Sequence, residues 1–335
     1  MTTAKIDVAV VGATGLIGDS IVSLLEEREF PVGQLFLLAS DRSIEKSLFY
    51  GGKWQHVNVA DEFDFARVQL VFLAVPMEAA KSYRERALKA NCWVIDVSAG
   101  VSPDWRFLNL VTRELADTRL LHLPHALSTQ LATVIKPLQE AFSVQSVSIT
   151  ALMAASSMGR AAVEELAKQT ALVLNVKPIK SKKFSKQLVF NLHPQSSVIE
   201  DDGMTLDEQR VAYELSAYLG IDSRDVAANI GLAPVFLGHS VWFELQLGRD
   251  VALTELRSTL RASSQIALLE GKKPGAFPSA VSEAAGKDLI FVGRLRQITS
   301  DPRRFSGFFA CDNTRIGGAL TAIQTAETLI KHQFS

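Results

Sequence analysis

The first third of the chain alternates short apolar runs with segments of helical periodicity. Residues 5–11, KIDVAVV, form a β-branched run that ends at a glycine, which is typical of a buried parallel strand. Apolar side chains then recur at helical spacing over residues 15–30, which predicts a helix directly after that strand. Strands and helices in alternation imply right-handed crossovers and a doubly wound parallel sheet. The same pattern predicts strands over 34–40, 70–75 and 93–98 and a helix over 78–91.

Longer and more amphipathic segments follow beyond residue 140. Residues 144–155 and 241–248 favour longer strands, and the second alternates apolar and polar positions more clearly. Residues 175–187, NVKPIKSKKFSKQ, are basic and Ser-rich, and this composition favours a solvated connector over an anion-binding loop. A mixed sheet covered by helices fits this half of the chain, with helices predicted over 159–174, 205–220 and 253–266.

The length of 335 residues indicates two domains, since a domain takes ~150 residues. Hydrophobic residues make up 47% of the chain, which is enough for two cores and argues against disorder. We predict an α/β protein in which residues 1–130 form a Rossmann-type doubly wound domain and residues 131–312 form an α+β domain. A long helix over 313–333 is expected to return and pack on the first domain.

Charge, cysteine content and the N-terminal segment bear on the partners and the cellular compartment of the protein. The formal net charge of −1 gives no electrostatic reason to expect nucleic acid or an anionic membrane as a partner. Cys92 and Cys311 do not make a disulfide framework, which fits a reducing cytosol. The N-terminal segment does not resemble a signal peptide, and no apolar run reaches the ~18 residues of a membrane span, so a cytoplasmic protein is expected. No metal is expected, because metal-ligand spacing is missing around His122, His125 and His193.

A glycine motif, GATGLIG (12–18), separates the first predicted strand from the first helix. Gly12 permits a tight turn, Gly15 lets the backbone approach a pyrophosphate, and Gly18 allows close packing of helix on strand. The phosphates would lie on the helix N-terminus, whose free N–H groups favour anions, and Thr14 could add a hydroxyl. The motif favours a dinucleotide site over a tight turn without a ligand.

The segment ASDRSIEK (39–46) follows the second predicted strand, where dinucleotide-binding domains hold the adenosine ribose. Ser40, Arg42 and Ser43 offer two hydroxyls and a guanidinium, which suit the 2′-phosphate of NADP. Asp41 could instead take the free ribose of NAD. We expect NADP, with NAD and a merely solvated polar turn as the alternatives.

Four blocks in one order extend these signals over nearly the whole chain. They are GATGLIG with ASDRS, HLPHALSTQLATVIKPL (122–138), APVFLGHS (233–240), and GKDLIFVGRLRQ (286–297) with DNTRIGGALTAIQTAE (312–327). Together they resemble the aspartate-semialdehyde dehydrogenase family, and in particular bacterial paralogues that lack its catalytic cysteine. The resemblance implies a homodimer with an NADP-binding domain and a catalytic and dimerisation domain, and it adds Asn313 to the cofactor-binding residues.

The resemblance also implies a chemistry, the reduction of aspartyl phosphate to the semialdehyde. In the family a cysteine thiolate expels phosphate, the resulting thioester takes a hydride from NADPH, a histidine handles the proton, and an arginine holds the substrate carboxylate. A thiolate suits this task because it is nucleophilic near neutral pH and leaves readily. His239 matches the histidine. Ala126 stands where the cysteine falls, ten positions before Lys136, and its methyl group cannot attack an acyl phosphate.

The sequence also differs from the family at positions that contact the substrate or lie near the nicotinamide. Leu232, two residues before Pro234, stands where the family has its substrate arginine, and Met153 takes the place of a substrate-contacting glutamine. Pro76 and Met77 replace a Gly-Gly turn that many relatives have near the nicotinamide. The positions of the nucleophile, the substrate-binding arginine and the substrate-contacting glutamine are thus all apolar. This indicates a pocket that no longer suits aspartyl phosphate.

Several residues could stand in for the missing group, and each has a structural alternative. Ser128 is a substitute nucleophile or, as the pattern favours, a helix cap. Cys311 is a relocated thiolate or, again favoured, a small buried hydrophobe, and Cys92 is expected in the core. His239 is an orphaned acid/base or a hydrogen-bonded structural histidine, and the sequence favours neither.

Three functional hypotheses follow, and the sequence does not establish that the protein is an enzyme. The first is a pseudoenzyme that keeps the fold, the dimer and the NADP site without the phosphorylating reduction, since losing a covalent nucleophile costs ~10⁴ in rate or more. The second is an NADP-dependent oxidoreductase for a different, uncharged carbonyl or alcohol, with His239 as the proton donor. The third is a residual semialdehyde dehydrogenase of amino-acid biosynthesis that uses Ser128 or Cys311.

Overall fold

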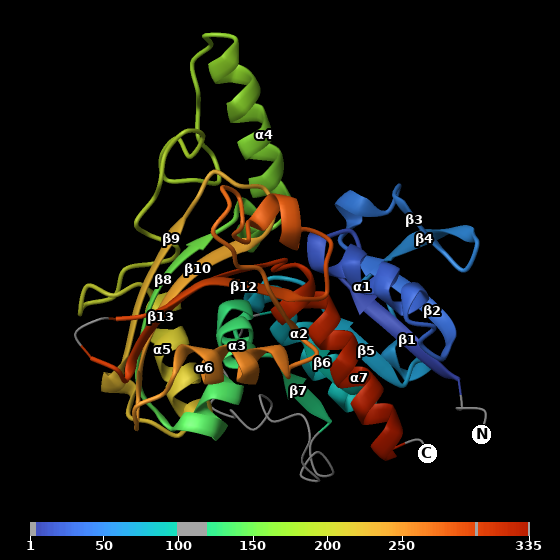
Figure 1. Ribbon diagram of the computed structural model, residues 1–335. Coiled ribbons are helices and arrows are strands. Elements are labelled where there is room, and N and C mark those ends of the chain that lie inside the picture. The colour runs from blue at the N-terminus through green and yellow to red at the C-terminus, as the bar shows by residue number, and fades with distance from the viewer. Residues whose placement is uncertain (1–4, 99–118, 299–300, 334–335) are drawn as a thin grey trace. The chain divides into compact units, whose positions relative to one another are not determined.

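The computed structural model describes residues 5–98, 119–298 and 301–333 (Figure 1). The chain divides into two compact units, residues 1–124 with 317–335, and residues 125–316. The sequence predicts boundaries at 130/131 and 312/313, whereas the compact units divide at 124/125 and 316/317. The first division falls earlier because a helix that belongs to the second unit begins at Ala126. Residues 1–4, the start of the N-terminal segment considered above, lie outside the described residues.

Unit 1 contains a seven-stranded sheet in the order β3-β4-β2-β1-β5-β6-β7. Every pairing is parallel except that of β3 with β4, which form a hairpin turned by two glycines with positive φ, Gly51 and Gly52. The predicted doubly wound parallel sheet is therefore confirmed, with one antiparallel edge strand added. The strands are β1 (Ile6–Val11), β2 (Val32–Ala39), β3 (Ser47–Tyr50), β4 (Lys53–Val59), β5 (Leu70–Leu73), β6 (Trp93–Asp96) and β7 (Leu120–His122).

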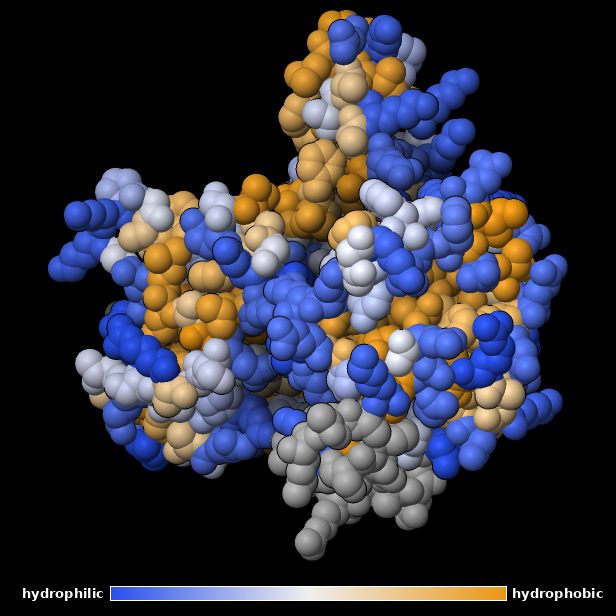
Figure 2. All heavy atoms as spheres, turned by 90° about the vertical axis from the view of Figure 1, so that its right-hand side faces the viewer, coloured by the Kyte–Doolittle hydropathy of each residue, from blue (hydrophilic) through white to orange (hydrophobic). Residues whose placement is uncertain are grey.

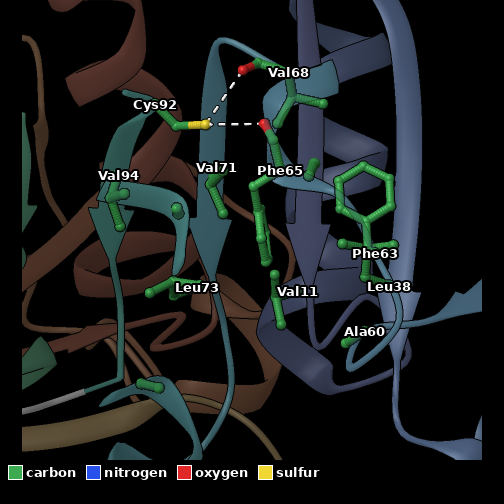
Figure 3. Packing of buried hydrophobic residues seen from close by; sticks show 13 residues of the cluster. Val11, Leu38, Ala60, Phe63, Phe65, Val68, Val71, Leu73, Cys92 and Val94 are labelled. Carbon is green, nitrogen blue, oxygen red and sulfur yellow. Dashed lines mark hydrogen bonds between the residues drawn. The ribbon is translucent and has the colours of Figure 1, made fainter. Parts of the chain in front are cut away.

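The strands of unit 1 are apolar because side chains of the central ones are buried on both faces. Figure 3 shows the cluster on one face, where Val11, Leu73 and Val94 from neighbouring strands meet Phe65. Cys92 belongs to this core, as expected: its Sγ lies 3.2 Å from the carbonyl oxygens of both Phe65 and Val68, and burial raises its pKa to about 11.

Among the described residues of unit 1, the α-helices are α1 (Leu16–Glu27), α2 (Met77–Lys89) and α7 (Leu320–Gln333). The C-terminal helix α7 lies beside α1 (Figure 1). Glu327 accepts two hydrogen bonds of 2.8 Å from the guanidinium of Arg28. The single helix predicted over 313–333 is interrupted. A π-helical turn spans Arg315–Ala319, where Gly317 has a φ of +82°, and the α-helix begins only after it.

Unit 2 contains a six-stranded mixed sheet in the order β11-β12-β13-β10-β8-β9, as the pattern predicted for this half. Burial alternates along β10, with odd-numbered residues from His239 to Leu247 buried, which explains the clear alternation in the sequence. The strands are β8 (Val144–Met153), β9 (Val226–Leu232), β10 (His239–Leu247), β11 (Ile266–Leu268), β12 (Ile290–Gln297) and β13 (Arg304–Cys311).

The α-helices of unit 2 are α3 (Ala126–Phe142), α4 (Arg160–Leu174), α5 (Leu206–Leu219) and α6 (Leu253–Arg261). The helix predicted over 253–266 ends at Arg261 because Ile266 already belongs to β11. The basic connector after α4 is held by its backbone, since the Glu165 carboxylate accepts the N–H groups of Lys182 and Lys183.

The segment comprising α4 and its connector projects from the rest of unit 2 (Figure 1). Figure 2 shows hydrophobic side chains along one side of this segment, and Leu174 and Val176 at its end are exposed. Exposed apolar surface of this kind marks an interaction site more often than chance. Within the described residues, no helix is both long and apolar enough to cross a membrane.

Candidate functional site

The glycine loop of unit 1 lies at the carboxyl ends of β1, β2 and β5. The N–H groups of Gly12 and Ala13 donate to Leu38 O at 2.8 and 3.1 Å, which ties the loop to the end of β2. Gly12 has a φ of +84°, and a Cβ there would lie 2.3 Å from the carbonyl oxygen of Ala74. A Cβ on Gly18 would lie 2.1 Å from Gly12 O, so only glycine fits at either position.

Gly15 is the N-cap of α1, and as a glycine it has no side chain with which to cap the helix. The N–H groups of a first helical turn have no partner within the helix, and the N-cap residue offers them no side-chain acceptor here. An added Cβ at Gly15 would meet Gly12 O at 3.2 Å, which is a tight contact, so a side chain there would press on the glycine loop. The loop therefore has the form of an anion cradle, and a dinucleotide pyrophosphate fits it.

The turn after β2 brings the predicted ribose-binding residues to the same edge of the sheet. Asp41–Ser43 form a single 3₁₀ turn, with Ser43 N donating to Ser40 O at 2.9 Å. Arg42 is exposed and has no ion-pair partner among the described residues, neighbouring Asp41 included. Its guanidinium is thus available to a ligand. The structure brings Gly12, Gly15, Gly18 and Ser40–Ser43 together within unit 1, and Thr14 lies in the same loop.

A buried charged group that the sequence reading missed lies further along this edge. The Asp96 carboxylate is fully buried at the end of β6; Arg84 Nη2 lies 2.9 Å and His122 Nδ1 3.2 Å from its Oδ2. Burial would raise the pKa of Asp96, but His122 and Ser98 outweigh it, so the pKa is lowered. The signal was the acid that closes the otherwise apolar strand WVID. Within the described residues, no three His, Cys, Asp or Glu side chains converge as metal ligands would.

In unit 2, the start of α3 carries the position matched to the family nucleophile. Ala126 is the first residue of α3, and His125 is its N-cap, with Nδ1 accepting the N–H of Leu127 at 3.3 Å. Burial lowers the pKa of His125, which keeps the ring neutral and able to accept. The cap expected at Ser128 is therefore wrong, since His125 supplies it.

A buried ion pair on α5 fixes this helix start. Glu214 is fully buried, its Oε1 lies 2.5 Å from Arg210 Nε, and its Oε2 accepts the N–H of His125 at 2.9 Å. A charge buried this deeply is tolerated because it is paired and hydrogen-bonded. The only sequence signal was the spacing of four residues between Arg210 and Glu214, which puts both on one helix face.

His239, the first residue of β10, is held by α3. Its Nδ1 lies 3.1 Å from Gln130 Oε1, and Gln130 Nε2 donates to Ile316 O at 2.9 Å. Because this orients the Gln130 amide with its oxygen toward the ring, Nδ1 carries the proton and Nε2 has only a lone pair. That Nε2 has no hydrogen-bond partner in the described part of the chain. Burial, followed by the neighbouring His125, lowers the pKa of His239 to about 3.

Ala126 and Gln130 are four residues apart on α3 and so share the helix face that meets His239. Ser128 lies about 200° around the helix from Ala126, on another face. It is fully buried, and its Oγ has no hydrogen-bond partner among the described residues. Cys311 lies directly opposite His239 in the β10–β13 pairing, but it is fully buried, and burial raises its pKa well above the usual range.

Asn313 acts within unit 2. Its Oδ1 accepts the hydroxyl of Ser156 at 2.9 Å and the N–H of Gly238 at 3.0 Å. Gly238 has a φ of +88° and directly precedes His239, so Asn313 helps to fix the entry to β10. This positioning contact was missed from the sequence, where Asn313 is predicted to contact the cofactor; that contact stays a prediction.

The apolar residues at the positions of the family's substrate-contacting glutamine and arginine are neighbours. Met153 and Leu232 are paired residues of the parallel strands β8 and β9, and both side chains are buried. The backbone of Leu232 also exchanges two hydrogen bonds with that of His193, of 3.1 and 2.8 Å. His193 thus has a structural role. In unit 1, Pro76 is the N-cap of α2 and Met77 its first residue, with the methionine side chain exposed.

Comparison with known proteins covers both units. Residues 7–116 match the family model of the semialdehyde dehydrogenase NAD-binding domain, and residues 135–316 match that of the semialdehyde dehydrogenase dimerisation domain. The chain is 36% identical over 333 residues to a USG-1 protein homolog of Pseudomonas aeruginosa, covering 98% of each chain. It is 31% identical to an aspartate-semialdehyde dehydrogenase of a Shewanella species, over 98% of this chain and 99% of the other.

A solved structure of an aspartate-semialdehyde dehydrogenase has the same fold over nearly the whole chain. Aspartate semialdehyde dehydrogenase II of Vibrio cholerae, in complex with ASA, superposes with a TM-score of 0.94 at 30% identity, over 99% of this chain and 100% of the other. The expected two-domain architecture and the resemblance to aspartate-semialdehyde dehydrogenases are confirmed, and the USG-1 homolog supports the likeness to a bacterial paralogue. The chain belongs to the semialdehyde dehydrogenase family.

Proposed function

We propose that this protein is a pseudoenzyme of the semialdehyde dehydrogenase family, which binds NADP without carrying out the family's covalent reduction of an acyl phosphate. One observation carries the proposal. Ala126 occupies the helix face that holds His239, so a methyl group stands where the mechanism needs a thiolate. Loss of a covalent nucleophile lowers the rate by ~10⁴ or more, and no binding contact restores it.

The surroundings of Ala126 support the same conclusion. Met153 and Leu232 are neighbouring, buried and apolar, and an anionic substrate needs a charged partner to offset the loss of its hydration. Ser128 lies on another face of α3, and the Cys311 thiol is kept protonated by burial. Neither residue is therefore a suitable replacement nucleophile.

NADP is the proposed ligand of unit 1. The glycine-capped start of α1 suits the pyrophosphate, and the exposed Arg42 with Ser40 and Ser43 suits a 2′-phosphate. A homodimer is proposed as well, since residues 135–316 match a dimerisation domain and unit 2 exposes large apolar side chains that a second subunit would cover. Those side chains include Leu174, Val176, Phe190 and Trp242.

The test combines cofactor titration with an activity assay of the purified protein. Nicotinamide fluorescence should report NADPH binding, and R42A should weaken it by about 10-fold or more while leaving NADH binding unchanged. The matched control K46A removes a neighbouring exposed charge and should change neither affinity. Phosphate-dependent oxidation of aspartate semialdehyde should be undetectable. Turnover at a rate typical of enzymes would overturn the proposal, and so would failure to bind either dinucleotide.

An oxidoreductase for an uncharged carbonyl or alcohol is the second candidate, and the lone pair of His239 Nε2 favours it. A bound nicotinamide would supply or accept the hydride. With a pKa of about 3, only ~10⁻⁴ of His239 is protonated at pH 7, so it suits accepting a proton from an alcohol better than donating one to a carbonyl. A screen of neutral alcohols with NADP should then reveal turnover that H239N abolishes, and no such turnover would exclude this candidate.

A further inference from the structure

Unit 2 contains a pocket of about 460 Å³ whose lining includes neither Ala126 nor His239. It lies between α6, the segment after β11, and β12. The charged residues that line it are Arg257, Arg261, Glu270, Lys272, Arg294 and Arg296. Five cations thus surround one carboxylate.

The single acid in this pocket is already satisfied. Arg257 Nε donates to Glu270 Oε2 at 2.7 Å, and the N–H of Leu295 donates to Glu270 Oε1 at 3.0 Å. The other four cations have no ion pair with any described residue. Four like charges therefore face one concavity without compensation, an arrangement that a bound anion would stabilise.

The backbone of β12 is distorted to present these side chains. The pairing with β13 shifts register between Gly293 and Arg296, which is a β-bulge, and Arg294 within it has a φ of +57°. A non-glycine residue rarely adopts this conformation, and such strain concentrates at functional sites. Bulges also re-aim side chains, so that Arg294 and Arg296 both line the pocket.

We propose that this pocket binds a small molecule carrying two or more linked phosphate groups. Guanidinium groups bind phosphate oxygens in pairs, and a chain of phosphates brings enough charge for several of them at once. The remaining lining residues, Gly271, Ala276 and Leu295, include no aromatic ring on which a base would stack. The pocket therefore recognises the phosphates themselves, and its occupant does not depend on the function proposed for the first site.

Titration calorimetry of the full-length protein tests this proposal, with inorganic pyrophosphate as the probe and orthophosphate for comparison. Because pyrophosphate could also enter the glycine loop, the protein carries the G15A substitution and is examined with and without added NADPH. Pyrophosphate should bind at least 10-fold more tightly than orthophosphate, and its affinity should fall as salt is raised.

The variant R294G removes one cation and places in the bulge the residue that prefers its φ. It should weaken pyrophosphate binding by at least 10-fold while leaving the thermal unfolding midpoint unchanged or higher. K273A is the matched control, since Lys273 adjoins Lys272 without lining the pocket, and it should leave the affinity unchanged. Equal effects of the two variants, or no binding at all, would overturn the proposal. Displacement of pyrophosphate by a short oligonucleotide of higher affinity would overturn it in favour of a nucleic-acid surface.

Discussion

The glycine loop of unit 1 and the start of α3 in unit 2 are both helix N-termini that follow a strand, yet their chemistry differs. At α1 the cap is Gly15, which has no side chain, and the exposed Arg42 lies at the same edge of the sheet. At α3 the cap is the His125 ring, buried Glu214 anchors that residue, and Gln130 holds His239. The first helix start has a glycine as its cap, whereas the second is capped and anchored by buried side chains of unit 2.

If the protein is a pseudoenzyme, as proposed, the residues around α3 keep the scaffold of the family site without its reaction. A buried Arg210–Glu214 pair and an oriented, neutral His239 are costly to maintain, because each buries groups that prefer water. They remain in place beside a methyl group. The supporting residues also hold the helix and β10 together, so they serve the fold even where no reaction occurs.

The largest expected effect is at the glycine loop. G18A places a methyl group against the Gly12 carbonyl and should lower the free energy of unfolding by about 3 kcal/mol or more, as chemical denaturation would measure. G15A should cost about 1 kcal/mol or less, because Gly15 has an ordinary φ of −74° and the closest contact of a Cβ would be 3.2 Å. G15A should nevertheless weaken NADPH binding by about 10-fold.

G52A is the matched control for these variants. Gly52 has a φ of +76° but no atom within 4 Å of an added Cβ, so alanine there should cost about 1 kcal/mol from backbone strain alone. Equal losses for G18A and G52A would mean that close packing of α1 on β1 is unimportant. If G15A binds NADPH with wild-type affinity, the glycine loop is not part of the cofactor site, and the contrast between the two helix starts fails.

The second effect is a pH dependence at His239. Burial holds the folded-state pKa near 3, against ~6.5 in the unfolded chain, so below pH 6.5 the unfolded chain binds a proton that the folded chain does not. Stability should therefore fall as the pH falls, by about 1 kcal/mol between pH 7 and pH 5.5 from this residue.

Urea unfolding at several pH values measures this term as the difference between the wild type and H239N, whose Nδ2 can replace Nδ1 as donor to Gln130. H56N, a substitution of an exposed histidine, is the control and should keep the wild-type pH dependence. If H239N keeps it too, His239 is not held neutral, and the proton-donor role becomes open to it again.

The two regions also differ in how far the sequence alone revealed them. The glycine loop is a local signal, because strand, glycines and helix are contiguous, and Gly12 and Gly18 have the steric roles expected of them. The His239 network is not local. Its partners Gln130 and Ile316 are far from it along the chain, and only the folded sheet brings them together.

Strands of unit 2 were missed for a related reason. Gly307 in β13 would ordinarily argue against a buried strand, but a Cβ there would lie 2.4 Å from the Phe243 ring, so the packing requires glycine. Likewise β12 contains Gly293 and the bulge after it. In both strands tertiary packing, rather than local propensity, decides the residue.

The smallest expected effect is that of restoring the missing thiol. A126C changes a half-buried residue and should alter the free energy of unfolding by about 0.5 kcal/mol or less. A thiol reagent should label only the introduced group in the folded protein, because Cys92 and Cys311 are both buried. We still expect no phosphate-dependent oxidation of aspartate semialdehyde, since Met153 and Leu232 leave the substrate anion without a charged partner. C311S in the same background should leave both the labelling and the absence of oxidation unchanged. If A126C alone were active, the pocket would still bind the family substrate. The absence of a thiol at position 126 would then by itself explain the absence of activity in the wild type.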